Sequence, residues 1–237
     1  MMLVESMSRK EIAKEVLNDY NTIVTSSTLE RLGYEYYRER NKLHIKKEAE
    51  YSRYYDLKTK SKNKWTLILY KADDLKKIQK IEDCSFLLYT FYYTGKNICV
   101  VRIAHNDMLE FYYGHLFARY RERMSLDMPN LMDVVKYYMK ISSISWNRKL
   151  PEEDGQIKVI ATLKGGFQLG EYDKENQCDV FKTFIPFETA NLLSKSEMKE
   201  TIYIMKHNLL YCNHLEEESL YHDLSVYLDM IGKEGKG

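Results

Sequence analysis

Short runs of aromatic and β-branched residues, bounded by turn residues, are the feature that most restricts the fold of this chain. Three runs lie in the middle of the chain and two or three more come later: Trp65–Tyr70, Phe86–Tyr93, Ile98–Ile103, Ile157–Leu163, Phe167–Tyr172 and Val180–Ile185. Their composition is typical of β-strands. Gly95-Lys96-Asn97 predicts a hairpin between the second and third runs, and Gly165-Gly166 predicts a tight turn between two later ones.

Helical periodicity surrounds these runs. The chain reads as helical to about Ser61, with Gly33 as a break, and a second helical pattern begins after Gly114. A further helix is expected at Leu131–Lys140, with Asn130 as its N-cap. The tail is expected to be helical from Ser194, where Ser194-Lys-Ser-Glu197 forms a capping box.

Together these patterns predict an α+β fold in which an antiparallel sheet packs against helices, with helical extensions at both ends. We expect a helical N-terminal region at residues 1–61, an α+β core at 62–187 and a helical tail at 188–237 that forms one compact unit with the core.

Charge and cysteine content exclude several classes of protein. The chain has 36 basic and 35 acidic residues, so a general attraction to nucleic acid or anionic lipid is not expected, and a site for a polyanion must be local. The four cysteines are widely scattered and are expected to be reduced core residues. No stretch approaches the length of a membrane span, so a cytoplasmic protein without a membrane partner or a cofactor is expected.

One local concentration of positive charge lies between Arg31 and Tyr55, where tyrosines alternate with basic residues. Bases stack on aromatic rings beside cations that contact phosphate, so Arg38, Arg40 and Arg53 are candidate RNA contacts. The alternative is an amphipathic helix pair that buries its tyrosines and exposes its charges.

The helical pattern after Gly114 places four polar residues on one side. At about 100° per residue, His115, Arg119, Glu122 and Arg123 share a stripe. The apolar side chains fall on the other side: Leu116, Phe117, Tyr120 and Met124. Two guanidiniums four residues apart can hold a phosphate, and an imidazole can exchange a proton near neutral pH. The alternative is a solvated helix face in which Glu122 pairs with a neighbouring arginine.

A resemblance gives this stripe a possible chemistry. The string His115-Leu-Phe-Ala-Arg119-Tyr120-Arg-Glu122-Arg123-Met124 is followed by Gly166-Phe-Gln-Leu-Gly170 and by Lys182-Thr183-Phe184-Ile185. It resembles an uncharacterised bacterial family with an H-x3-R-Y-x-E-R-M core. The order of elements is also similar to that of RelE/BrnT-type toxins in the barnase/EndoU/colicin/RelE-like ribonuclease superfamily.

The resemblance implies a metal-independent endoribonuclease site. It assigns His115 as acid or base, Arg119 and Arg123 as the phosphate clamp, and Lys182 or Thr183 as a partner from the facing strand. Glu122 joins the catalytic set, and Tyr120 joins the residues that contact substrate. The resemblance covers about a third of the chain, and small toxins of this kind lack the N-terminal and C-terminal additions found here.

Other groupings of reactive residues are weaker. Cys212, His207, His214 and His222 lie in the tail at spacings that do not favour a zinc site. His105 with Asp107 comes after a strand and is a reserve candidate for the same cleft as His115.

Three functions therefore stay open. The first is an endoribonuclease or its degenerate descendant, and the second is a non-catalytic protein that binds RNA or a protein. The third is a structural or partner protein of a mobile element, whose charged helix stripe is merely solvated. An inhibitor or partner protein fits each of them.

Overall fold

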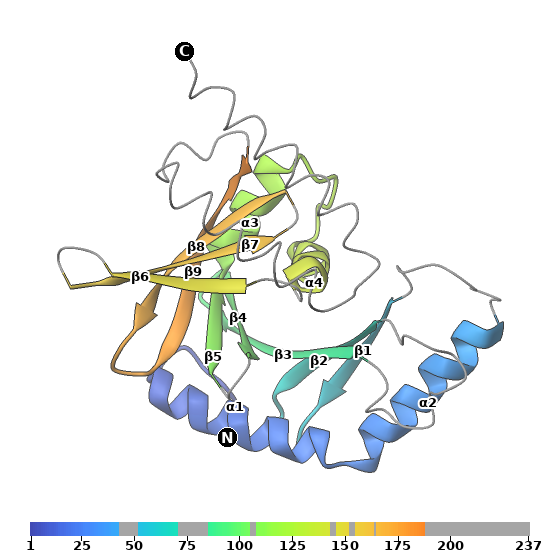
Figure 1. Cartoon of the computed structure of the whole chain (residues 1–237). Helices are drawn as coiled ribbons and strands as arrows, with labels where there is room; N and C mark the ends of the chain where they lie inside the picture. The colour runs from blue at the N-terminus through green and yellow to red at the C-terminus, as the bar shows by residue number, and fades with distance from the viewer. Residues whose placement is uncertain are drawn as a thin grey trace. The chain divides into compact units, whose positions relative to one another are not determined.

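The computed structural model describes residues 1–42, 52–70, 85–104, 108–142, 146–151, 155–163 and 165–187 (Figure 1). The chain divides into two compact units, unit 1 (Met1–Phe111) and unit 2 (Tyr112–Gly237). Each unit combines helices with antiparallel strands, so the expected α+β class is confirmed. The boundary between them falls within strand β5 (Leu109–Tyr113).

Unit 1 contains an antiparallel meander whose strands pair in chain order. These strands are β1 (Ser52–Lys58), β2 (Lys64–Tyr70), β3 (Ser85–Thr94) and β4 (Asn97–Ile103). The expected hairpin between β3 and β4 is confirmed, because Thr94 pairs with Asn97 across a two-residue turn. Gly95 in that turn has a φ of +59°, a conformation that glycine adopts without strain.

Two helices precede the strands of unit 1. Helix α1 (Arg9–Val24) begins at a capping box, in which the side chains of Ser8 and Glu11 each accept a hydrogen bond from the other residue's backbone N–H. The backbone N–H of Ser8 also lowers the pKa of the Glu11 carboxyl. Helix α2 (Ser27–Lys42) runs through Gly33 without a break, so the interruption expected there is wrong.

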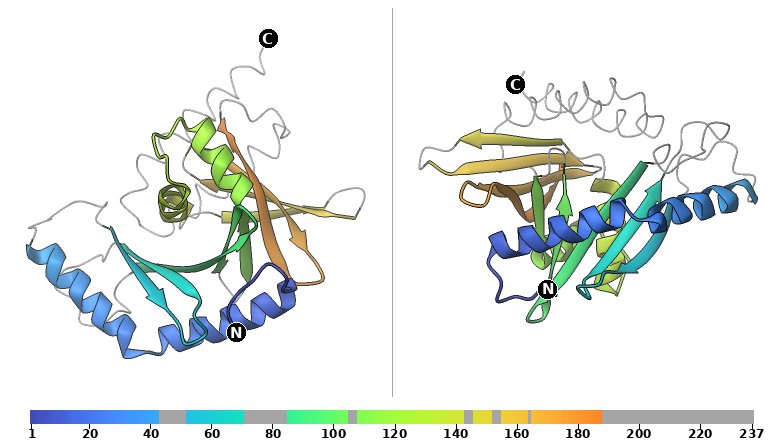
Figure 2. Two further views of the ribbon diagram at one scale, coloured as in Figure 1. Left: turned by 180° about the vertical axis from the view of Figure 1, so that it is seen from behind. Right: turned by 90° about the horizontal axis from the view of Figure 1, so that it is seen from below.

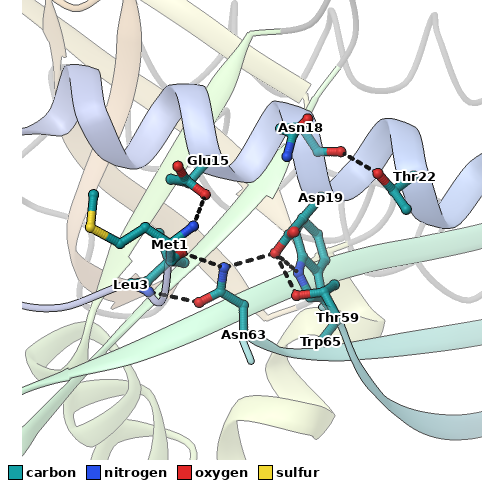
Figure 3. A network of polar contacts seen from close by, with 9 residues as sticks. All are labelled: Met1, Leu3, Glu15, Asn18, Asp19, Thr22, Thr59, Asn63 and Trp65. Carbon is teal, nitrogen blue, oxygen red and sulfur yellow. Dashed lines mark hydrogen bonds and ion pairs between the residues drawn. The ribbon is translucent and has the colours of Figure 1, made fainter. Parts of the chain in front are cut away.

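Helix α1 is anchored to the β1–β2 hairpin through a buried carboxylate, Asp19 (Figure 3). One oxygen of this carboxylate accepts hydrogen bonds from three side chains, those of Thr59, Asn63 and Trp65. Asn63 also holds the chain near its start, through the carbonyl of Met1 and the N–H of Leu3. Three donors on one oxygen offset the cost of removing the carboxylate from water.

Strand β1 replaces a helix that the sequence led us to expect. The region before Ser61 was expected to be helical, but residues 52–58 pair along their whole length with β2. Four of the seven β1 residues are exposed, and none is fully buried. Its sequence therefore lacks the apolar alternation that marks a half-buried strand.

Unit 2 begins with two helices, α3 (Gly114–Arg123) and α4 (Leu131–Ile141). Asn130 caps α4 by accepting from the N–H of Met132, which confirms that expectation. A second antiparallel meander comes next, made of β6 (Trp146–Pro151), β7 (Ile157–Leu163), β8 (Gly166–Asp173) and β9 (Cys178–Pro186). The last three strands agree with the sequence pattern, whereas β6 was not expected.

The core of unit 2 is a cluster of aromatic side chains between the helices and β9. Helix α3 packs alongside β9, as the left view of Figure 2 shows. The rings that meet there are almost fully buried: Tyr112, Phe117, Tyr120, Tyr138, Phe181 and Phe184. Most of the ring contacts in this cluster are edge-to-face. Such contacts stabilise the fold in addition to the burial of apolar surface.

Other expectations can be judged only where the structure describes the chain. Cys99 and Cys178 are buried and free, as expected, and burial raises the pKa of the Cys99 thiol to about 11. Cys84, Cys212 and the helical tail from Ser194 lie outside the described residues. No helix in the described part of the chain is long and apolar enough to cross a membrane.

Candidate functional site

The polar stripe expected on the helix after Gly114 is present on α3. Leu116, Phe117 and Tyr120 are buried, whereas His115 and Glu122 are exposed and Arg119 is partly so. The side chains thus separate into the two stripes that the helical spacing predicts.

Three of the stripe's polar groups contact one another. The Nε of Arg119 donates to the Nε2 of His115 over 3.4 Å, and a terminal nitrogen of Arg119 donates to the Glu122 carboxylate over 3.0 Å. We name the exposed His115–Arg119–Glu122 chain of contacts the α3 triad.

The other arginines of α3 are used differently. Arg123 donates to the backbone carbonyl of Phe184 in β9. Arg121 donates to the carbonyls of Met128 and Pro129, in the connection between α3 and α4. Each contact satisfies a main-chain acceptor, so these two side chains help to hold α3 against its neighbours.

Lys182 and Thr183, the expected partners of the α3 stripe, lie next to each other at an irregularity of β9. Leu169 of β8 pairs with Thr183, and the next residue, Gly170, pairs with Phe181. The backbone of Lys182 is therefore not paired in the register with β8, which is the arrangement of a β-bulge, and its Nζ lies 2.5 Å from the Glu171 carboxylate of β8.

The bulge places Lys182 and Thr183 on the sheet face that points away from α3. Phe184 contacts the ring of Tyr120 in α3, and Phe181 stacks on Tyr112 within the same aromatic cluster. Both phenylalanines therefore point toward the helices, and the two residues between them point the other way. The α3 triad and the Lys182–Thr183 pair are thus on opposite sides of β9.

Tyr120, expected to contact substrate, is a core residue. Its side chain is 2% exposed and its ring lies 4.9 Å from that of Tyr138 and 4.8 Å from that of Phe184, between ring centroids. Burial also raises the pKa of its hydroxyl. Its place in the H-x3-R-Y-x-E-R-M string is explained by packing in unit 2.

The arginines expected to bind RNA in unit 1 lie on two elements, α2 and β1. Arg38 is exposed on α2, and Arg53 forms an ion pair with Glu39. In β1, Arg53 and Tyr54 point to opposite faces of the sheet, whereas Arg53 and Tyr55 point to the same face. Arg40 belongs to α2 by its backbone, and its side chain lies outside the described part of the structure.

Sequence reasoning missed an open depression on the surface of unit 2. It is lined by residues of β7, β8 and β9 and by the residue before β7: Gln156, Ile157, Lys158, Leu169, Gly170, Glu171, Lys182 and Thr183. Lys158 and Glu171 are direct cross-strand partners. Strand alternation could have placed these two on one face, but the pairing register that joins them was not known.

The described His, Cys, Asp and Glu residues were also compared with the arrangement that a metal site requires. Within the residues that the structure describes, no group of three or more His, Cys, Asp or Glu side chains is arranged to hold a metal ion. His105, Asp107 and the cluster of Cys212, His207, His214 and His222 lie outside those residues.

Comparison with known proteins gives no relative from which a role could be transferred. No family model, curated protein or solved structure matches the chain. The resemblance to RelE-like ribonucleases therefore rests on the sequence motifs alone, and a role for the chain must be argued from the geometry of unit 2.

Proposed function

We propose that this chain is a non-catalytic RNA-binding protein, or a degenerate relative of an endoribonuclease, whose α3 triad contacts a phosphate of the RNA backbone. The observation that carries the proposal is the exposed contact of His115, Arg119 and Glu122 on the side of α3 opposite its buried stripe. The proposal holds for a local contact, because a net charge of +1 provides no general attraction to RNA.

Arg119 is suited to exchange Glu122 for a phosphate. The side chains of Arg119 and Glu122 are 41% and 66% exposed, and an ion pair in such a setting contributes at most about 1 kcal/mol. A guanidinium presents several N–H groups in one plane and can donate two parallel hydrogen bonds to phosphate oxygens. The imidazole of His115 can add one more donor through its other ring nitrogen.

The placement of Lys182 and Thr183 is the reason for preferring binding over cleavage. Metal-independent cleavage needs a base, an acid and a cationic clamp around a single phosphate. The expected partners from β9 lie on the other face of the sheet, and Arg123 is directed to the carbonyl of Phe184. Among the described residues, the proposed phosphate contact on α3 therefore has no facing group from Lys182 or Thr183.

Binding is tested with labelled single-stranded RNA and fluorescence anisotropy at low salt. Arg119→Ala should weaken binding about fivefold, because one charge-assisted contact at a partly exposed position is lost. Glu122→Gln should strengthen it about twofold, because the competing carboxylate is removed. The matched control is Arg31→Ala, which removes an exposed arginine from the i,i+4 pair with Glu35 in α2. Equal loss in Arg31→Ala and Arg119→Ala would refute the α3 site.

The second candidate function is the endoribonuclease itself, favoured by an exposed histidine 3.4 Å from an arginine. It is distinguished by incubating total RNA or tRNA with the protein in EDTA. Intact RNA with wild type supports the non-catalytic proposal. Cleavage by wild type that disappears in His115→Ala would replace that proposal with the enzyme, whereas equal cleavage by both proteins would exclude His115 from the reaction.

A further inference from the structure

The turn between β1 and β2 in unit 1 carries four lysines at alternate positions. All four side chains are exposed: Lys58, Lys60, Lys62 and Lys64. None of them forms an ion pair with a residue that the structure describes. We name this set of four side chains the lysine turn.

The residues between the lysines hold the turn in place. Thr59, Asn63 and the adjacent Trp65 donate to the buried carboxylate of Asp19 in α1 (Figure 3). Two hydrogen bonds close the backbone of the turn. The N–H of Lys62 donates to the carbonyl of Thr59 over 2.9 Å, and the N–H of Thr59 donates to the carbonyl of Asn63 over 3.1 Å. The lysines thus extend from an ordered backbone, and a ligand that binds them does not have to order the turn.

The arrangement of the lysines is unfavourable for the protein alone. Lys58 and Lys64 are direct cross-strand partners, and like charges in that position destabilise a pair of strands. Lys62 has a φ of +67°, a left-handed conformation that strains a lysine more than a glycine or an asparagine. Backbone strain of this kind occurs preferentially at functional sites, and an anionic ligand would also relieve the repulsion between the lysines.

Two carboxylates, Asp19 and Asp56, belong to the hairpin or to its anchor on α1. Asp19 is buried and accepts three hydrogen bonds, whereas Asp56 in β1 accepts one from the hydroxyl of Thr66 over 3.1 Å. Even with both carboxylates counted in full, they are outnumbered by the four ammonium groups. Among the described residues of this hairpin and its anchor, positive charge is therefore in excess.

We infer that the lysine turn binds the phosphodiester backbone of RNA. Lysine is a point charge that serves well as a phosphate ligand, and the hydroxyl of Ser61 lies between two of the lysines in the sequence as a further donor. Residues 58–64 are Lys, Thr, Ser and Asn, so the turn has no apolar side chain to insert into lipid or to form the core of a protein interface. The inference rests on the proposed function only for the choice of RNA as ligand, because this site lies in unit 1 and the α3 triad in unit 2.

The test is the salt dependence of binding to labelled single-stranded RNA, measured by fluorescence anisotropy. Each phosphate contact adds about 0.7 to the magnitude of the slope of log affinity against log salt concentration. The double variant Lys58→Gln with Lys62→Asn should therefore lower that magnitude by about 1.4 and weaken binding about tenfold at low salt. Its Tm should equal or exceed that of wild type, because the like-charge pair and the strained lysine are both removed. A loss of binding at an unchanged or higher Tm cannot come from unfolding.

The matched control is Lys10→Gln with Lys14→Gln, which removes two exposed lysines from α1 in the same unit and should leave the slope unchanged. Equal changes of slope in the two double variants would overturn the inference, since general charge and not the turn would then determine binding. Association with phosphatidylserine vesicles in place of RNA would also overturn it.

The α3 proposal and this inference fail separately. If Arg119→Ala weakens binding and the lysine-turn variant keeps the wild-type slope, the inference is overturned and the α3 proposal stands. The reverse pattern supports the inference and refutes the α3 contact. If wild type does not bind RNA at low salt, both are refuted.

Discussion

Two arginine–glutamate pairs in this chain occupy opposite environments. Arg102 and Glu110 of unit 1 have side chains that are 6% and 2% exposed, whereas Arg119 and Glu122 of unit 2 are 41% and 66% exposed. A guanidinium and a carboxylate thus form a buried structural ion pair in unit 1 and a solvent-exposed ion pair in unit 2. A buried pair cannot give up a partner without stranding a charge, but an exposed pair can exchange its carboxylate for a phosphate.

The largest effect is expected from breaking the buried pair. Glu110→Ala should lower the free energy of unfolding by about 3–5 kcal/mol, because Arg102 would keep its charge in a buried position. Urea unfolding followed by Trp65 fluorescence, in a Trp146→Phe background, would report on unit 1. The matched change in the exposed pair, Glu122→Ala, should alter stability by less than about 0.5 kcal/mol.

A double variant tests whether the unpaired charge of Arg102 causes the loss of stability in Glu110→Ala. Replacing both Arg102 and Glu110 with apolar residues, as in Arg102→Met with Glu110→Leu, should recover most of the loss, since no unpaired charge remains. A double variant as unstable as Glu110→Ala would mean that other contacts of these side chains, and not the ion pair, maintain unit 1.

The Asp19 network of unit 1 should give the next largest effect. Asp19→Ala removes the acceptor shared by Thr59, Asn63 and Trp65 and should cost about 2–3 kcal/mol. Asp19→Asn keeps one acceptor oxygen and should cost less. Asn18→Ala, at the exposed neighbouring position in α1, is the control in the same urea experiment. An equal loss from Asn18→Ala would show that the helix and not the network is affected.

The sequence predicted some of these features and not others. The polar and apolar stripes of α3 were predictable from helical spacing, because the periodicity of apolar residues in an amphipathic helix shows which face is buried. Asp19 was missed, although it lies at helical spacing from Ile12, Val16 and Ile23 on the buried side of α1. A lone acid on an apolar helix face was therefore an available signal for a buried network.

Strand pairing accounts for the remaining differences. Strand β1 is mostly exposed and β6 contains Pro151 and basic residues, so neither has the apolar pattern of a strand. The position of Lys182 and Thr183 depends on a bulge, and one inserted residue reverses the face of every side chain beyond it. Such a register is set by contacts between β8 and β9 that neither strand's sequence contains alone.

The smallest expected effect is the salt dependence of the Arg119–Glu122 coupling free energy. A double-mutant cycle of Arg119→Ala and Glu122→Ala should give a coupling free energy of about 0.3 kcal/mol at low ionic strength. The coupling should approach zero as the Debye length falls from about 30 Å to about 3 Å between roughly 0.01 M and 1 M salt. The Arg102–Glu110 coupling should persist over the same range, because solvent ions do not reach a buried pair. If the Arg119–Glu122 coupling proved insensitive to salt, Arg119 would be fixed by the fold, and its exchange of Glu122 for phosphate would lose its physical basis.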